Sequence, residues 1–109
     1  MNVYDQLHEL ERAIRESEEF KQYAAVKDKV AGNDELNNMI KDYQAKQMEL
    51  QMKQAMGESI EEEAMKLMQP LYEVMMKDPI AAEYLQCEMR FGMMMNDVYK
   101  VMTELAAGK

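Results

Sequence analysis

Residues 79–105 read PIAAEYLQCEMRFGMMMNDVYKVMTEL, and this stretch decides the fold. Its apolar residues recur in alternating steps of four and three, which is the repeat of one helix face. That face consists of Ile80, Tyr84, Cys87, Phe91, Met94, Val98, Val101 and Leu105. Such a sustained repeat is typical of long helices with antiparallel, coiled-coil-like packing. Asp78-Pro79 predicts the helix start, because aspartate caps helices and proline suits the first position.

The amino-terminal third shows the same helical periodicity. One side of a first helix is lined by Val3, Leu7, Leu10 and Ile14. A weaker pattern continues to Gly32, and Ser17 within it is a possible cap or joint, so one helix or two remain open. Gly32-Asn33 predicts a turn, because glycine suits a helix end and asparagine caps the helix that follows.

Two more helices are expected between this turn and Asp78. The first runs to about Met56, ends at Gly57 and has an inward face made of Leu36, Ile40, Tyr43, Gln47 and Leu50. Ser59 and Glu62 have capping-box spacing for the second, in which Pro70 should introduce a kink or an early end. Its inward residues are Ala64, Leu67, Met68, Leu71 and Met75. We therefore predict an all-α fold of about four long antiparallel helices, one domain over residues 1–109, dimerising into a helical bundle.

The chain is acidic, with 21 Asp and Glu against 13 Lys and Arg and a formal net charge of −8. This charge repels phosphate backbones, so we expect no direct contact with nucleic acid. No uncharged run approaches the roughly 20 apolar residues of a membrane span, and the first residues lack the pattern of a signal peptide. We expect a cytoplasmic protein that does not bind a membrane.

Few residues offer chemistry. His8 is the only histidine, and helical geometry places it and Asp5 far from the apolar stripe, so we expect both in solvent rather than at a metal. The carboxylates Glu61, Glu62 and Glu63 are interpreted as a solvated helix start. Cys87 lies on the apolar seam and is interpreted as a small buried hydrophobe. We expect no enzyme, catalytic residue, metal, cofactor or small-molecule substrate.

Methionine is unusually abundant, with 14 residues in the chain. Several form a second apolar stripe on helices that already have one, and a helix with two apolar sides needs two partners. These candidate interface residues are Met48, Met52, Met56, Leu85, Met89 and Met93. We expect them to contact a second copy in a homodimer, or alternatively another cytosolic protein.

Several short motifs resemble one family of bacterial proteins. They are Val3-Tyr4-Asp5, Asn33-x-Glu35-Leu36, Met39-Ile40-x-x-Tyr43, Lys46-Gln47-x-x-x-Gln51, Tyr84-Leu85-x-x-Glu88-x-x-Phe91 and Met95-x-Asp97-Val98. Together they resemble the YlbF/YmcA family, and within it the YheA-type branch. The resemblance implies long antiparallel helices, dimerisation and a cytosolic location in low-G+C Gram-positive bacteria.

The resemblance also implies a regulatory role. Some members of the family join YaaT in a complex that carries iron–sulfur clusters and influences competence, sporulation, biofilm formation and RNA processing. Members implicated in cluster binding bring several cysteines, whereas this chain has Cys87 alone, so the cluster role is not transferred. The leading hypothesis is a homodimeric adaptor or regulatory subunit. The alternatives are a metal or redox-sensing protein that pairs Cys87 across a dimer, with Met94 nearby, and a small holdase-like chaperone.

Overall fold

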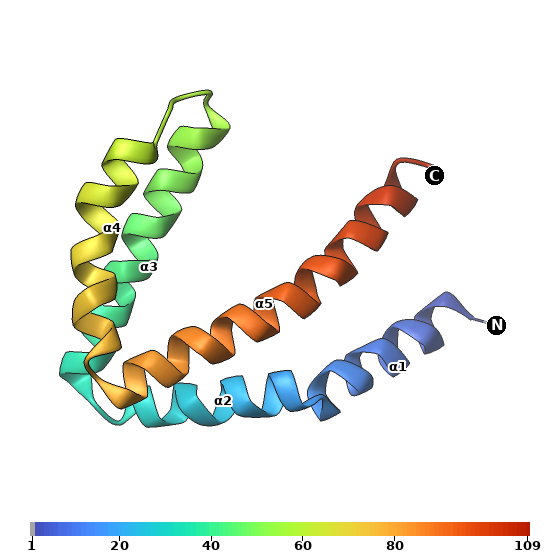
Figure 1. The fold of residues 1–109 in the computed structure, drawn as a ribbon. Coiled ribbons are helices and arrows are strands. Elements are labelled where there is room, and N and C mark those ends of the chain that lie inside the picture. The colour runs from blue at the N-terminus through green and yellow to red at the C-terminus, as the bar shows by residue number, and fades with distance from the viewer. Residues whose placement is uncertain (1) are drawn as a thin grey trace. The chain divides into compact units, whose positions relative to one another are not determined.

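The computed structural model describes residues 2–109, and this range contains five α-helices (Figure 1). They are α1 (Val3–Glu16), α2 (Glu18–Ala31), α3 (Asp34–Ala55), α4 (Glu61–Met76) and α5 (Pro79–Ala106). The all-α prediction is confirmed, but the expected number of about four helices is wrong. The additional helix arises because the amino-terminal pattern is divided in two.

Ser17 causes this division. Its backbone is extended, with φ −68° and ψ 150°, so it belongs to neither neighbouring helix. Its hydroxyl donates a hydrogen bond of 2.6 Å to the carbonyl of Ile14 and accepts one of 3.2 Å from the amide of Phe20. One side chain therefore satisfies backbone groups at the end of α1 and at the start of α2.

The helices form two compact units. Unit 1 contains residues 2–27 and 84–109, and unit 2 contains residues 28–83. In unit 2, α3 and α4 form an antiparallel hairpin (Figure 1). The buried apolar residues of unit 2 are Val30, Leu36, Ile40, Leu50, Met75 and Ala81. Most of them lie on the stripes that the sequence assigned to the core. The prediction of one domain over residues 1–109 stays a prediction.

Asparagine and aspartate caps begin two of the helices as predicted. The Asn33 side chain accepts a hydrogen bond of 3.1 Å from the Leu36 amide at the start of α3. The Asp78 carboxylate accepts hydrogen bonds of 2.9 and 3.2 Å from the amides of Ile80 and Ala81, which begins α5 beside Pro79. Local chemistry therefore fixes both boundaries.

The turn between α3 and α4 differs from its prediction. Gly57 has a positive φ of 87°, and the amides of Gly57 and Glu58 bond back to Gln54 and Lys53, as in a Schellman motif. The chain then turns so that Ile60, and not Ser59, occupies the N-cap position of α4. The predicted capping box of Ser59 and Glu62 is therefore wrong, because α4 begins one residue later and no side chain caps it.

Glu63 has a different role in this turn. It accepts a hydrogen bond of 2.6 Å from the ammonium group of Lys53, which ties the end of α3 to the start of α4. This hydrogen bond, together with the nearby charges of Glu63, Glu49 and Glu58, holds the pKa of Lys53 above its usual 10.5 despite an opposing effect of desolvation. The acidic run is thus partly engaged in holding the hairpin and partly exposed to solvent.

Pro70 lies in the interior of α4, which continues to Met76. Of the two outcomes expected for Pro70, a kink or an early end, the early end does not occur. The Pro70 side chain is exposed, so its ring meets solvent and not the core. Among the described residues, no helix is both long and apolar enough to cross a membrane.

Replacing Ser17 by alanine should lower the free energy of unfolding by about 0.5–2 kcal/mol, because the start of α2 loses its cap. Urea titration followed by circular dichroism measures this change.

Ser59→Ala is the matched control, since Ser59 is exposed and does not cap α4. It should change the free energy of unfolding by less than about 0.5 kcal/mol. Equal effects of the two substitutions would contradict the capping role of Ser17.

Candidate protein-contact site

An aromatic cluster holds α2 against α5 in unit 1. The rings of Tyr23 and Phe91 stack with their centroids 5.1 Å apart, and Phe20 meets Phe91 edge-on at 5.8 Å. The ring centroids of Tyr84 and Tyr23 are 5.8 Å apart, and the two hydroxyl oxygens are 3.5 Å apart. Aromatic pairs of this kind add to the stabilisation that comes from their burial. This cluster joins α2 to α5 through four rings.

Tyr84 is the most deeply placed of these rings, with 3% of its surface exposed. Burial raises the pKa of its hydroxyl well above the usual 10.0, and the hydrogen bond with Tyr23 and the charge of Glu88 act in the same direction. Each favours the neutral phenol over the phenolate. Tyr84 therefore keeps its proton inside the cluster.

Away from the cluster, α1 and the last part of α5 are poorly covered. The predicted stripe of α1 forms, yet Val3 is 79% and Leu7 50% exposed, and Leu10 and Ile14 are half-buried. None of the residues of α1, all of which are described, is buried. Toward the termini α1 and α5 draw apart (Figure 1). The apolar stripe of α1, which was expected to be buried, therefore faces an open space between α1 and α5.

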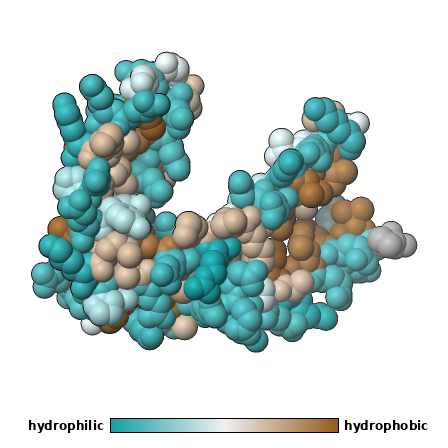
Figure 2. Space-filling view, in the orientation of Figure 1, coloured by the Kyte–Doolittle hydropathy of each residue, from teal (hydrophilic) through white to brown (hydrophobic). Residues whose placement is uncertain are grey.

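This space between α1 and α5 is an apolar groove. It comprises one pocket of about 310 Å³ beside Phe20 and a second of about 340 Å³ closer to the amino terminus. Figure 2 shows hydrophobic side chains gathered there. The apolar residues of this α1–α5 groove are Val3, Tyr4, Leu7, Leu10, Ile14, Phe20, Met95, Val98, Tyr99 and Met102.

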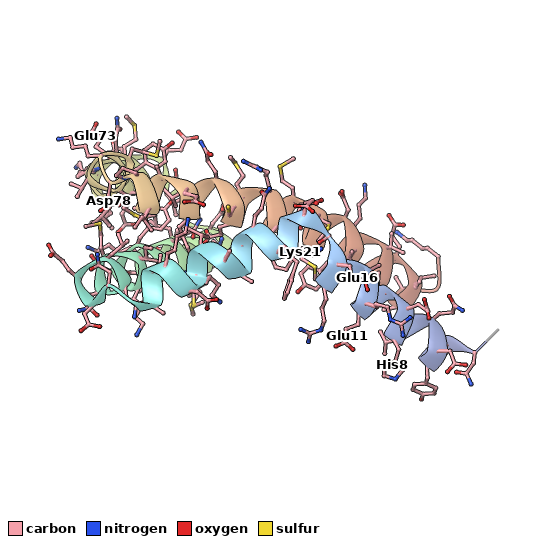
Figure 3. All side chains as sticks on the ribbon, turned by 90° about the horizontal axis from the view of Figure 1, so that it is seen from below. His8, Glu11, Glu16, Lys21, Glu73 and Asp78 are labelled. Carbon is pink, nitrogen blue, oxygen red and sulfur yellow. The ribbon has the colours of Figure 1, made fainter. Side chains whose placement is uncertain are left out.

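Two charged residues of α1, Glu11 and Arg15, line the groove beside its apolar residues, and four charges of this helix pair within it. Arg15 lies 3.1 Å from Glu11, and Arg12 lies 3.5 Å from Glu9. In Figure 3 the side chain of His8 points away from α5, and His8 is exposed as the sequence predicted. A binding partner would therefore contact apolar residues inside the groove and, at its edge, charged side chains that are already partly paired with each other.

The predicted methionine stripes are on the surface. On α3 the side chains of Met48, Met52 and Met56 are 62–79% exposed. On α5, Met89 and Met93 are 61% and 66% exposed, whereas Leu85 is half-buried. The first three belong to unit 2 and the others to unit 1. Their role in protein contact stays a prediction.

Cys87 lies inside unit 1 with 5% of its surface exposed. Its interpretation as a buried hydrophobe is confirmed. Within residues 2–109 no group of three or more His, Cys, Asp or Glu side chains is arranged to hold a metal ion.

Sequence reasoning missed the groove, although it had placed six of its ten apolar residues, Phe20 among them, on helical apolar patterns. Tyr4, Met95, Tyr99 and Met102 were not assigned to any surface. The sequence did contain a signal for the three of these residues on α5. Beyond Phe91, α5 has apolar residues on three adjacent rows, and one neighbouring helix cannot cover all three.

The sequence that forms these five helices matches a known family. The profile described as "Control of competence regulator ComK, YlbF/YmcA" matches residues 3–105. The chain belongs to the YlbF/YmcA family. The predicted resemblance is confirmed, and the match includes the groove and both methionine stripes.

Relatives of this YlbF/YmcA protein are similar over nearly their whole length. The UPF0342 protein of Symbiobacterium thermophilum is 36% identical, with 94% of this chain and 91% of the relative covered. The UPF0342 protein of Caldicellulosiruptor saccharolyticus is 35% identical, with 94% and 86% covered. That of Halothermothrix orenii is 33% identical, also with 94% and 86% covered.

The buried hydroxyl of Tyr84 should make the stability of this YlbF/YmcA protein depend on pH. Above about pH 10 the tyrosine ionises in the unfolded chain but keeps its proton in the folded one. The folded state then binds more protons, so the stabilisation is complete below pH 10 and is lost as the pH rises.

The parent should therefore lose stability relative to Tyr84→Phe above pH 10, by up to about 1.4 kcal/mol per pH unit. Urea titrations of both proteins at pH 8 and at two values above pH 10 measure the difference. A difference that stays constant over this range would show that the hydroxyl is not shielded.

Proposed function

We propose that this YlbF/YmcA protein is a cytosolic, non-enzymatic regulatory adaptor that acts through protein–protein contacts and assembles with itself. The observation that supports this proposal is the exposure of α1, which presents an apolar stripe over an open groove. Large apolar patches on soluble proteins mark interaction sites, because leaving them in water is unfavourable.

The methionine stripes support the same function. Met48, Met52 and Met56 on α3 form one exposed row, and Met89 and Met93 on α5 form part of another. Methionine has three rotatable bonds and a polarisable sulfur, so it adapts to partners of different shape. We assign these two rows to contacts with other proteins, which is the work of an adaptor.

The description of the family supplies the regulatory part of the proposal. It links the YlbF/YmcA family to control of the competence regulator ComK. Carried over to this chain, that description favours a protein whose partners belong to gene regulation. No reaction is required for such a role, since an adaptor needs only surfaces that bind.

Site-specific photo-crosslinking in living cells tests the proposal. A photoreactive phenylalanine derivative placed at Met52 or at Met89 should crosslink to the same distinct protein in repeated experiments, identified by mass spectrometry. Both side chains are more than 60% exposed, so the probe fits without disturbing the core.

Gln51 and Arg90 are the matched controls, because each is exposed and adjacent in sequence to one of the methionines. One residue turns the side chain by about 100° around the helix, which takes the probe off the apolar row. Crosslinking at Met52 and Met89 that is no stronger than at these controls would exclude the rows as contact surfaces.

A further inference from the structure

We infer that the α1–α5 groove is the surface through which two copies of this chain pack against each other, so that α1 and α5 of both copies form a four-helix arrangement. This inference rests on the proposed function, which requires self-assembly, and it names the surface. The methionine rows, which the sequence assigned first to a homodimer, then remain available for a different protein.

The exposed apolar area matches what a stable dimer needs. Tyr4 and Tyr99, which are 73% and 61% exposed, offer roughly 200–330 Å² at about 150–250 Å² per aromatic side chain. Five others in or beside the groove are 44–79% exposed, namely Val3, Leu7, Val101, Met102 and Leu105. They add roughly 170–350 Å² at about 60–120 Å² per buried aliphatic side chain.

The sum is on the order of 400–700 Å² of apolar area on each copy. A standard interface buries about 800 Å² per partner, of which roughly 57%, or about 450 Å², is apolar. The groove and the neighbouring end of α5 therefore supply the apolar part of one whole interface.

Charge favours a second copy at this surface over one at unit 2. Unit 1 carries nine acidic and seven basic side chains, whereas unit 2 carries twelve acidic and six basic ones. Two identical surfaces with a large excess of one sign repel each other. Contact through unit 1 brings together nearly balanced surfaces, and on α1 the pairs Glu9–Arg12 and Glu11–Arg15 already match their charges.

The shape of the surface suits a symmetric pair. Two-fold contacts require one patch to be complementary to itself. Here each copy offers both parts, because the groove is a recess and the side chains of Tyr4 and Tyr99 at its edges are exposed. Each of its two pockets has room for about ten water molecules at about 30 Å³ each, and apolar side chains from a second copy would displace them.

The decisive experiment is the molar mass in solution of the full chain and four variants, measured by light scattering after size exclusion at micromolar concentration. Leu7 and Met102 line both pockets of the groove, so Leu7→Glu and Met102→Glu place a charge in the contact. Met52→Glu and Met89→Glu place the same charge on exposed methionines outside it.

The parent should have twice the 12.8 kDa mass of one chain, as should both control variants. Leu7→Glu and Met102→Glu should weaken dimerisation at least tenfold and shift the mass to 12.8 kDa, with unchanged helicity by circular dichroism. A monomeric parent, or dimers that dissociate only in the Met52 and Met89 variants, would overturn the inference.

A second measurement remains decisive if a groove variant does not fold. A photoreactive residue in place of Tyr99 should give a covalent dimer of the otherwise unchanged chain on irradiation, and its absence would overturn the groove contact. The proposed function is judged separately, by crosslinks from Met52 and Met89 to another protein. Those crosslinks can persist when the groove contact fails.

Discussion

The aromatic contact between α2 and α5 is the interaction on which unit 1 depends. Phe20 and Tyr23 on one helix meet Tyr84 and Phe91 on the other, with ring centroids 5.1–5.8 Å apart. Because large rings dominate the energetics of a small core, this contact fixes where the two helices are closest. Beyond the cluster α5 is only partly covered, since Met95 and Val98 are half-buried while Tyr99 and Met102 are exposed.

Ser17 separates α1 from α2 at the edge of this cluster. Its extended backbone ends α1 and restarts the chain as α2, so the two segments do not continue along one axis. The side chains of α1 are therefore carried away from the last turns of α5, and the groove opens where the helices draw apart. The backbone conformation at this one residue thus accompanies the opening of an apolar recess in unit 1.

Unit 2 is organised by different means. Its hairpin is closed by the glycine turn at Gly57 and by the link between Lys53 and Glu63. Its buried residues are mostly aliphatic side chains of α3, together with Met75 of α4 and small residues from the adjoining ends of α2 and α5. Two packed helices can bury only one face each, so the opposite faces remain in solvent. Met48 and Met52 lie on the exposed face of α3 and Met56 follows at its C-cap, so this row of methionines is in solvent.

The sequence by itself determined the helices and most of their limits. Asn33, Gly57 and Asp78 act through hydrogen bonds and backbone angles of neighbouring residues, so their effect can be predicted without knowing the fold. The exposed position of His8 and the buried position of Cys87 followed from helical geometry in the same way. Only the tertiary structure decided that the stripe of α1 reaches no core, because this depends on how far apart two helices lie. Periodicity shows which side of a helix is apolar, whereas the distance to the neighbouring helix decides whether that side is buried or left open.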